Sequence, residues 1–200
     1  MNENKTTKQR ILDVATDLFA QYGFKEVSMR QIAADVGIKA SSLYKHYDSK
    51  EDILAYIFGV FKEKIRQTEA PIPHFASLKE YFTMAYAQFK QVMGAPDVMK
   101  IAKIITKEQM YSDSARAFMI EEMIEKPVQA TKYILDMMQA NGRINVSDTQ
   151  VIAEEYCAYI VYLYFEQNIL NAEPDLDYID RKMKQHNDFI VRCINNEGGN

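Results

Sequence analysis

Tryptophan is absent from the 200-residue chain, and glycine, proline and cysteine are scarce, at seven, five and two residues. Almost every glycine and proline falls between stretches of helical periodicity, which leaves little sequence for turns between β-strands. The two cysteines, Cys157 and Cys193, lie in apolar helical patterns and form neither a disulfide framework nor a paired metal-binding motif. These shortages predict an all-α chain in a reducing compartment.

Long hydrophobic runs are also missing. The longest, residues 156–165, is shorter than the roughly 20 residues that a membrane-spanning helix needs, and the first ten residues contain no apolar signal segment. The chain has no glycine-rich phosphate loop, no histidine and carboxylate cluster at ligand spacing and no nucleophile motif. We therefore expect a soluble cytoplasmic protein that is not an enzyme and that needs no cofactor or metal.

Charge is distributed unevenly along the chain, although the net charge of −4 is small. Residues 1–50 carry eight Lys and Arg against six Asp and Glu, whereas residues 51–200 carry sixteen against twenty-two. A locally basic segment suits a nucleic-acid partner. We predict a small domain at residues 1–50 and a larger helical domain at residues 51–200.

Helical periodicity and capping residues predict nine helices. A capping box of Thr6 and Gln9 begins the first, and Gly23 ends it. Asp48 and Ser147 are the expected caps of the fourth and eighth. The expected ranges, of which the seventh is kinked or split at Pro127, are about 6–22, 28–36, 40–46, 48–68, 75–92, 97–110, 113–140, 147–170 and 176–194.

The second and third predicted helices, joined by a short turn that contains Gly37, have the spacing of a helix-turn-helix. The third helix carries hydroxyls, a tyrosine, a lysine and a histidine, with Leu43 as its aliphatic residue. A helix that enters the major groove needs such hydrogen-bonding side chains. Leu43 and Tyr47, four residues apart, are expected to anchor it on the apolar residues of the first two helices.

The stretch "GIKASSLYKHYDSKEDIL" at residues 37–54 resembles the recognition segment of the tetracycline-repressor (TetR) family of bacterial regulators, and the resemblance covers about residues 6–58. It implies an all-α, nine-helix TetR-like fold and a transcriptional regulator, most often a repressor, that binds a palindromic operator as a homodimer. The residues that match the family pattern in order are Gly37, Ile38, Ser42, Leu43, Tyr44, His46, Tyr47, Lys50 and Glu51.

The resemblance also implies which side chains contact DNA. Phosphate contacts are expected from Ser28 and Arg30 at the start of the second helix and from Lys50 at the start of the fourth. Many family members have Ser or Thr where this chain has Lys39, so the usual cap of the recognition helix is missing. The other positions that contact DNA or vary with sequence preference are Lys39, Ala40, Ser41, Ser42, Tyr44, Lys45 and His46.

Residues 51–200 are expected to bind a small, largely apolar effector. The chain as a whole has thirteen Tyr, ten Phe and eleven Met, and side chains of these types suit a molecule of mixed character. Such a stripe is more often plain core. The candidates lie on the fifth, seventh and eighth helices: Phe82, Tyr86, Phe89, Met119, Met123, Tyr133, Met137 and Tyr156.

The last two helices are expected to form the dimer as a two-plus-two bundle. The alternative is that their stripes pack within their own chain. The candidate residues for the dimer surface are Tyr159, Ile160, Leu163, Ile179, Met183, His186 and Ile190.

Two other functions remain open. The first is a ligand-binding or adaptor protein of the same fold without specific DNA regulation, which sequence-specific binding to palindromic DNA would distinguish. The second is a redox sensor that uses Cys157 and Cys193, although inert core thiols fit their apolar surroundings better. For a regulator, the fourth helix is the expected lever between two dimer geometries that an effector would shift.

Overall fold

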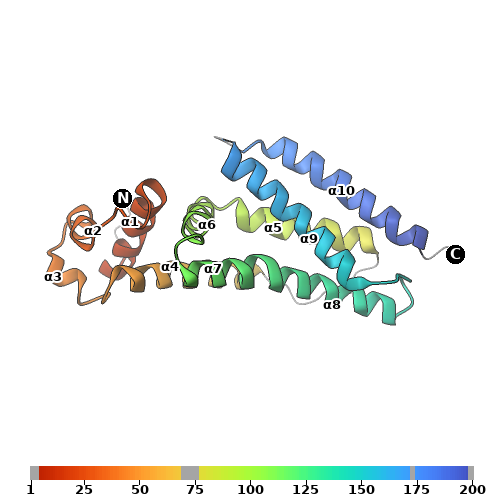
Figure 1. Ribbon diagram of the computed structural model, residues 1–200, viewed down its shortest axis with the longest axis horizontal. Coiled ribbons are helices and arrows are strands. Elements are labelled where there is room, and N and C mark those ends of the chain that lie inside the picture. Colours follow the sequence, from red (N-terminus) through yellow and green to blue (C-terminus); the bar gives the residue numbers. More distant parts are fainter. Residues whose placement is uncertain (1–4, 69–76, 172–173, 198–200) are drawn as a thin grey trace. The chain divides into compact units, whose positions relative to one another are not determined.

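The computed structural model describes residues 5–68, 77–171 and 174–197, which form nine continuous helical segments and no β-strand (Figure 1). The all-α, nine-helix prediction is confirmed for this part of the chain. The start that the sequence predicts for the fifth helix, near residue 75, lies outside the described residues. Within these ranges no helix is both long enough and apolar enough to cross a membrane.

Packing divides the chain into two compact units: residues 1–69 with 92–118 form unit 1, and residues 70–91 with 119–200 form unit 2. Unit 1 therefore includes residues that the sequence assigns to the larger domain. The two packed units therefore do not meet at residue 50, and the predicted division of function at that residue stays a prediction.

Unit 1 is built around its first helix, which packs against three others. Its helices are α1 (Thr7–Tyr22), α2 (Met29–Val36), α3 (Ala40–Leu43), α4 (Lys50–Thr68), α6 (Pro96–Glu108) and α7 (Asp113–Phe118). α1 contacts α2, α4 and α6, and α4 also contacts α6. The predicted capping box is present, since the Thr6 hydroxyl accepts from Gln9 N–H and Gln9 Oε1 accepts from Thr6 N–H. Gly23 and Gly37 end α1 and α2 at φ values of 89° and 77°, which residues with a Cβ rarely adopt.

Unit 2 is a layered bundle in which α9 packs against both α8 and α10 (Figure 1). Its elements are α5 (Leu78–Met93), the π-helical segment η1 (Met119–Glu125), α8 (Lys126–Ala140), α9 (Thr149–Phe165), the π-helical segment η2 (Glu166–Leu170) and α10 (Leu176–Glu197). Apolar residues from α5, α8, α9 and α10 form one core, which includes Leu78, Phe82, Leu135, Met138, Tyr156, Leu163, Met183 and Ile190.

Pro127 coincides with a change of helix type instead of a break. It lies in the first turn of α8, and η1 runs directly into that turn. Proline cannot donate to the carbonyl four residues earlier, which here belongs to Met123. A π-helical turn, in which hydrogen bonds span five residues, lets the helix continue past such a gap.

Two predicted helix caps are wrong by one residue. α4 begins after Ser49, whose hydroxyl accepts a hydrogen bond from the first turn, and not after Asp48. α9 begins after Asp148, whose carboxylate accepts two such bonds, and not after Ser147. At both places two neighbouring residues can cap a helix, so the choice depends on local backbone geometry.

Candidate functional site

The predicted recognition helix is shorter than expected. α3 covers four residues, and residues 44–46 continue it as a tighter turn. In that turn the N–H groups of Lys45 and His46 donate to the carbonyls three residues earlier, at 3.3 and 2.9 Å. Such geometry is common where an α-helix ends. The side chains expected to contact DNA therefore project from one helical turn followed by a 3₁₀-like turn.

Two side chains anchor this segment as predicted. Leu43 is 0% exposed and Tyr47 is 2% exposed. The Tyr47 hydroxyl donates to the Lys8 carbonyl (3.4 Å), and its ring meets the Tyr56 ring edge-on, with 5.2 Å between centroids. Burial, with smaller contributions from Tyr56 and Asp52, raises the pKa of Tyr47 to about 12. The anchor is therefore a neutral phenol with an apolar body.

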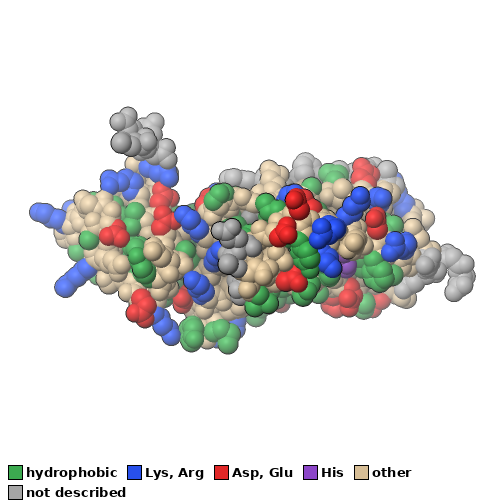
Figure 2. Space-filling view, turned by 90° about the horizontal axis from the view of Figure 1, so that it is seen from above, with side chains coloured by type: hydrophobic (Ala, Val, Ile, Leu, Met, Phe, Trp, Pro, Cys, Tyr) green, Lys and Arg blue, Asp and Glu red, His purple; other side chains and the backbone are tan. Residues whose placement is uncertain are grey.

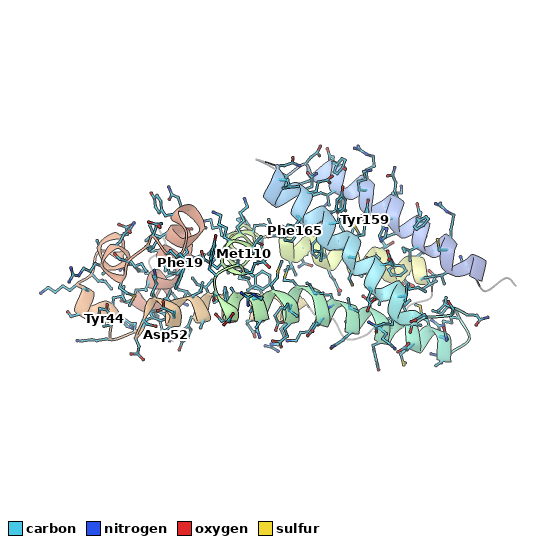
Figure 3. The ribbon with its side chains drawn as sticks, viewed as in Figure 1. Phe19, Tyr44, Asp52, Met110, Tyr159 and Phe165 are labelled. Carbon is cyan, nitrogen blue, oxygen red and sulfur yellow. The ribbon has the colours of Figure 1, made fainter. Side chains whose placement is uncertain are left out.

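The side chains predicted to contact DNA in α2, α3 and the following turn face solvent wholly or in part. Tyr44, which Figure 3 labels, is 52% exposed. Figure 2 shows Lys and Arg side chains projecting from this end of unit 1. Hydrogen-bonding groups on the outside and apolar anchors on the inside make a surface suited to phosphates and base edges. The exposed members are Ser28, Arg30, Lys39, Ser41, Tyr44, Lys45 and His46, and the half-buried ones are Ala40 and Ser42.

The caps of α2 and α3 differ. The Ser28 oxygen accepts from the N–H of Gln31 (3.2 Å), which leaves its own hydrogen able to donate to a phosphate. Lys39 precedes α3, and its side chain makes no capping hydrogen bond. The missing cap predicted at Lys39 is confirmed.

Lys50 is placed differently from the other predicted phosphate ligands. Its ammonium donates to the carbonyls of Phe24 (2.6 Å) and Lys25 (3.4 Å), and it lies 4.3 Å from the centre of the Phe24 ring. Lys50 thus ties the start of α4 to the turn between α1 and α2. The contact between Lys50 and a phosphate stays a prediction. To make that contact, the ammonium must either keep these hydrogen bonds while also bonding to the phosphate or give them up.

α6 supports α1 through contacts that sequence reasoning missed. Glu108 is 6% exposed, and its Oε1 accepts from the N–H of Phe24 (3.2 Å). Lys100 forms an ion pair of 2.5 Å with Asp17 on α1. The available sequence signal is a glutamate in register with the apolar stripe of α6, because a charged residue in such a stripe is rarely buried without a partner.

Six of the eight predicted effector residues are buried or half-buried: Phe82, Tyr86, Phe89, Met119, Met123 and Tyr156. The structure brings three of these, Phe82, Tyr86 and Tyr156, into one cluster, which among the described residues does not include the other three. Tyr133 and Met137 are 52% and 44% exposed. They lie on the outer face of α8, so their assignment to a pocket is corrected.

Part of the predicted dimer surface is also corrected. Leu163, Met183 and Ile190 are buried in the core of unit 2. For these three residues the alternative, packing within their own chain, is the correct one. The members that stay half-buried are Tyr159, Ile160, Ile179 and His186.

The error in α10 comes from the choice between spacings of three and four residues. The expected stripe passes through His186, whereas the buried positions of α10 are Met183, Asn187, Ile190 and Ile194. Both series fit a helical period. The buried stripe contains Asn187, and an asparagine is rarely expected in a core, so the sequence pointed to the stripe through His186 instead. Asn187 is therefore the buried residue that the predictions missed.

A polar centre lies where α5, α9 and α10 meet. The backbone carbonyl of Phe82 accepts hydrogen bonds from the Tyr156 hydroxyl and from Nδ2 of Asn187, both at 3.2 Å. The His186 ring stacks on Tyr159 (4.1 Å, 19°) and lies nearly parallel to Tyr156 (5.8 Å, 16°). Burial raises the pKa of Tyr156 and lowers the pKa of His186 to about 4. All these side chains are therefore uncharged at neutral pH.

The two cysteines have different surroundings. Cys157 is buried beside the Thr131 hydroxyl, at 3.7 Å, and burial raises the pKa of its thiol to about 11. Cys193 is exposed, so the expectation that both thiols belong to the core is wrong for Cys193.

The N-terminal segment is similar to a known family. Residues 11–57 match the family described as bacterial regulatory proteins, tetR family. An HTH-type transcriptional regulator of Staphylococcus aureus strain USA300 is 32% identical over 82 residues, which is 41% of this chain and 41% of that protein. The chain therefore matches less than half the length of this relative.

Solved structures are similar to the chain over most of its length. A protein from Saccharomonospora viridis, described as a transcriptional regulator and solved in complex with choline, has a TM-score of 0.70 and 19% identity, with 92% of this chain and 95% of that chain covered. A fatty acid degradation regulator from Bacillus halodurans has a TM-score of 0.67 and 14% identity, with 95% and 97% covered. At these identities the likeness shows a shared fold.

Proposed function

The chain belongs to the tetR family of bacterial regulatory proteins through residues 11–57, and on this premise we propose that it is a transcriptional regulator that binds operator DNA. The observation that carries the proposal is the exposed face of α3 and the turn at residues 44–46, held in place by the buried Leu43 and Tyr47. Arg30, Lys39 and Lys45 supply positive charge for phosphates.

We infer that the regulator acts as a homodimer on a palindromic operator. One head offers few phosphate contacts, and two heads spaced for successive major grooves, about 34 Å apart, sum their contributions. Three large apolar side chains on α9 and α10, Val151, Tyr162 and Phe189, are 50%, 53% and 53% exposed. Such side chains support a dimer face on these two helices.

A small, largely apolar effector is the proposed signal. The cluster that contains Phe82, Tyr86 and Tyr156 supplies aromatic walls with a few hydroxyls, which is the usual character of a ligand site. A protein of the same fold was solved in complex with choline, which supports a small-molecule ligand for this chain as well. Binding to one dimer geometry would shift the population away from the form that binds DNA.

DNA binding is tested by fluorescence anisotropy with a palindrome from the promoter region of the protein's own gene, at several salt concentrations. We expect Lys45→Ala to weaken binding and to lower the slope of log affinity against log salt by about 1. Lys184→Ala, which removes an exposed lysine of α10, is the matched control and should leave both unchanged. Equal affinity for the palindrome and for a scrambled duplex would contradict the proposal.

A further inference from the structure

Two buried polar atoms in unit 2 have no hydrogen-bond partner among the described residues. They are Oδ1 of Asn187 and Nε2 of His186, which are neighbours on α10. Asn187 is 7% exposed. Folded proteins rarely leave buried acceptors unpaired, and an exception indicates a bound water, ion or ligand. A polar group of a ligand that bonded to these atoms would therefore satisfy hydrogen bonds that the described residues leave unmade.

The orientation of the Asn187 amide follows from its other contact. Nδ2 donates to the Phe82 carbonyl, so the flipped amide would place Oδ1 against a carbonyl oxygen. The unpaired atom is thus a hydrogen-bond acceptor, and its partner must be a donor.

The His186 ring extends this site without adding charge. Its stacking partner Tyr159 is half-buried, as is His186 itself, and assigning both residues to the effector site removes them from the predicted dimer surface. Burial lowers the pKa of His186 to about 4, and the neutral imidazole has one nitrogen that donates and one that accepts. A group that both donates and accepts suits the Asn187 and His186 pair.

The two lysines of α5 already form ion pairs with aspartates of α10. Lys79 forms an ion pair with Asp188 (3.4 Å), and Lys90 forms one with Asp180 (2.5 Å). The Tyr86 hydroxyl also donates to Asp180 (2.6 Å). An anionic ligand would thus need to compete with these carboxylates, and its own oxygens would face the Asn187 acceptor.

We propose that Asn187 and His186 form the polar end of the effector site and that the effector presents an uncharged hydroxyl on an apolar body. The hydroxyl donates its hydrogen to Oδ1 of Asn187 and accepts one from Nε2 of His186. Phe82, Tyr156 and Tyr159 contact the apolar body. This inference rests on the proposed function, because it assigns the chemistry of the effector. Carboxylates and ammonium groups are disfavoured because the lysines of α5 and the aspartates of α10 that could balance a buried charge are already paired with each other.

The first test compares straight-chain primary alcohols with the carboxylic acids of the same chain lengths. Binding is measured by titration calorimetry and thermal shift on the full chain without DNA. We expect the best alcohol to bind at least about tenfold more tightly than its matching acid, the usual worth of one well-placed hydrogen bond. The proposal is overturned if no alcohol binds more tightly than its matching acid.

The second test uses variants that keep volume and stacking. Asn187→Leu and His186→Phe should each weaken alcohol binding by about tenfold, whereas loss of a purely structural contact would leave the preference for alcohol over acid intact. Tyr81→Phe is the matched control, because it removes a different buried hydrogen bond of unit 2, from the Tyr81 hydroxyl to Thr131, and leaves both proposed ligands and the proposed contacts of the apolar body in place. Wild-type alcohol affinity in folded His186→Phe protein sinks the proposal even if Asn187→Leu fails to fold.

The ligand measurements need no DNA, so the two proposals fail separately. If operator DNA is bound and released by another compound while alcohols show no preference over acids, the inference about the effector is wrong and the regulator stands. If alcohols bind as expected and no operator is bound, the regulator proposal is wrong and the site stands. Ordered waters on both atoms in crystals soaked with alcohol would also overturn the site.

Discussion

The recognition segment of unit 1 and the polar centre of unit 2 place polar side chains in opposite ways. Around α3 the hydrogen-bonding groups face solvent while Leu43 and Tyr47 are buried. In unit 2, polar atoms of His186 and Asn187 are buried while Phe189 is 53% exposed. A surface for a charged polymer must be polar outside, whereas a site for a small apolar molecule needs a few polar atoms inside. The position of the polar groups thus distinguishes the two proposed functions.

The largest expected effect comes from removing a buried leucine in either unit. Leu43 and Leu135 are both 0% exposed. Truncation to alanine should lower the free energy of unfolding by about 2–5 kcal/mol in each case, because the cavity only partly collapses. The measurement is denaturant unfolding followed by circular dichroism.

The variants Leu43→Ala and Leu135→Ala also distinguish an effect on stability from an effect on DNA binding. At a temperature where both variants are folded, Leu43→Ala should lose operator binding because the recognition turn loses its anchor. Leu135→Ala, on α8 of unit 2, should keep it. Wild-type operator affinity in Leu43→Ala would show that the turn holds its shape without this side chain.

A smaller effect is expected at Glu108, the buried acid that joins α6 to the turn after α1. Glu108→Ala leaves the N–H of Phe24 without its acceptor and should lower the free energy of unfolding by about 1–3 kcal/mol. Glu108→Gln keeps an amide oxygen and should lower it less. Equal losses in the two variants, measured by denaturant unfolding, would mean that the negative charge matters more than the hydrogen bond.

The sequence predicted the recognition segment well because its signals are local. Helix caps, glycine stops and the spacing of Leu43 and Tyr47 depend on residues a few positions apart, and the structure confirms Thr6, Gly37 and both anchors. The length of α3 was overestimated, because a 3₁₀-like turn and an α-helical turn look alike in sequence. The support from α6 was missed, because Glu108 is far from Phe24 in the chain.

Prediction in unit 2 was weaker because burial there depends on which helix faces which. Periodicity alone fits two neighbouring stripes on α10, and only packing against α5 and α9 selects the one that contains Asn187. Tyr133 and Met137 likewise have the composition of a ligand site but lie on the exposed face of α8. Residue type predicted the character of the site, and tertiary contacts determined its members.

The half-buried side chain of His186 should make stability depend on pH. In the folded chain, burial lowers the pKa of His186 from its ordinary value of 6.5 to about 4. Between these values the unfolded state binds more protons, so the free energy of unfolding should fall as pH drops from 6.5 toward 4. His186→Phe should flatten this dependence in denaturant titrations across that range. An unchanged slope would place the titrating group elsewhere.

The smallest effect concerns thiol reactivity, which changes no packing. Cys193 is exposed, while Cys157 is buried with a pKa of about 11, so Cys193 has the more accessible sulfur. Native protein should react with one equivalent of a disulfide reagent, and denatured protein should react with two. The Cys193→Ser variant should lose the reaction of the native protein. If Cys193 reacts slowly at high protein concentration and faster on dilution, a second copy of the chain covers the end of α10. The proposed dimer face would then lie nearer the C-terminus.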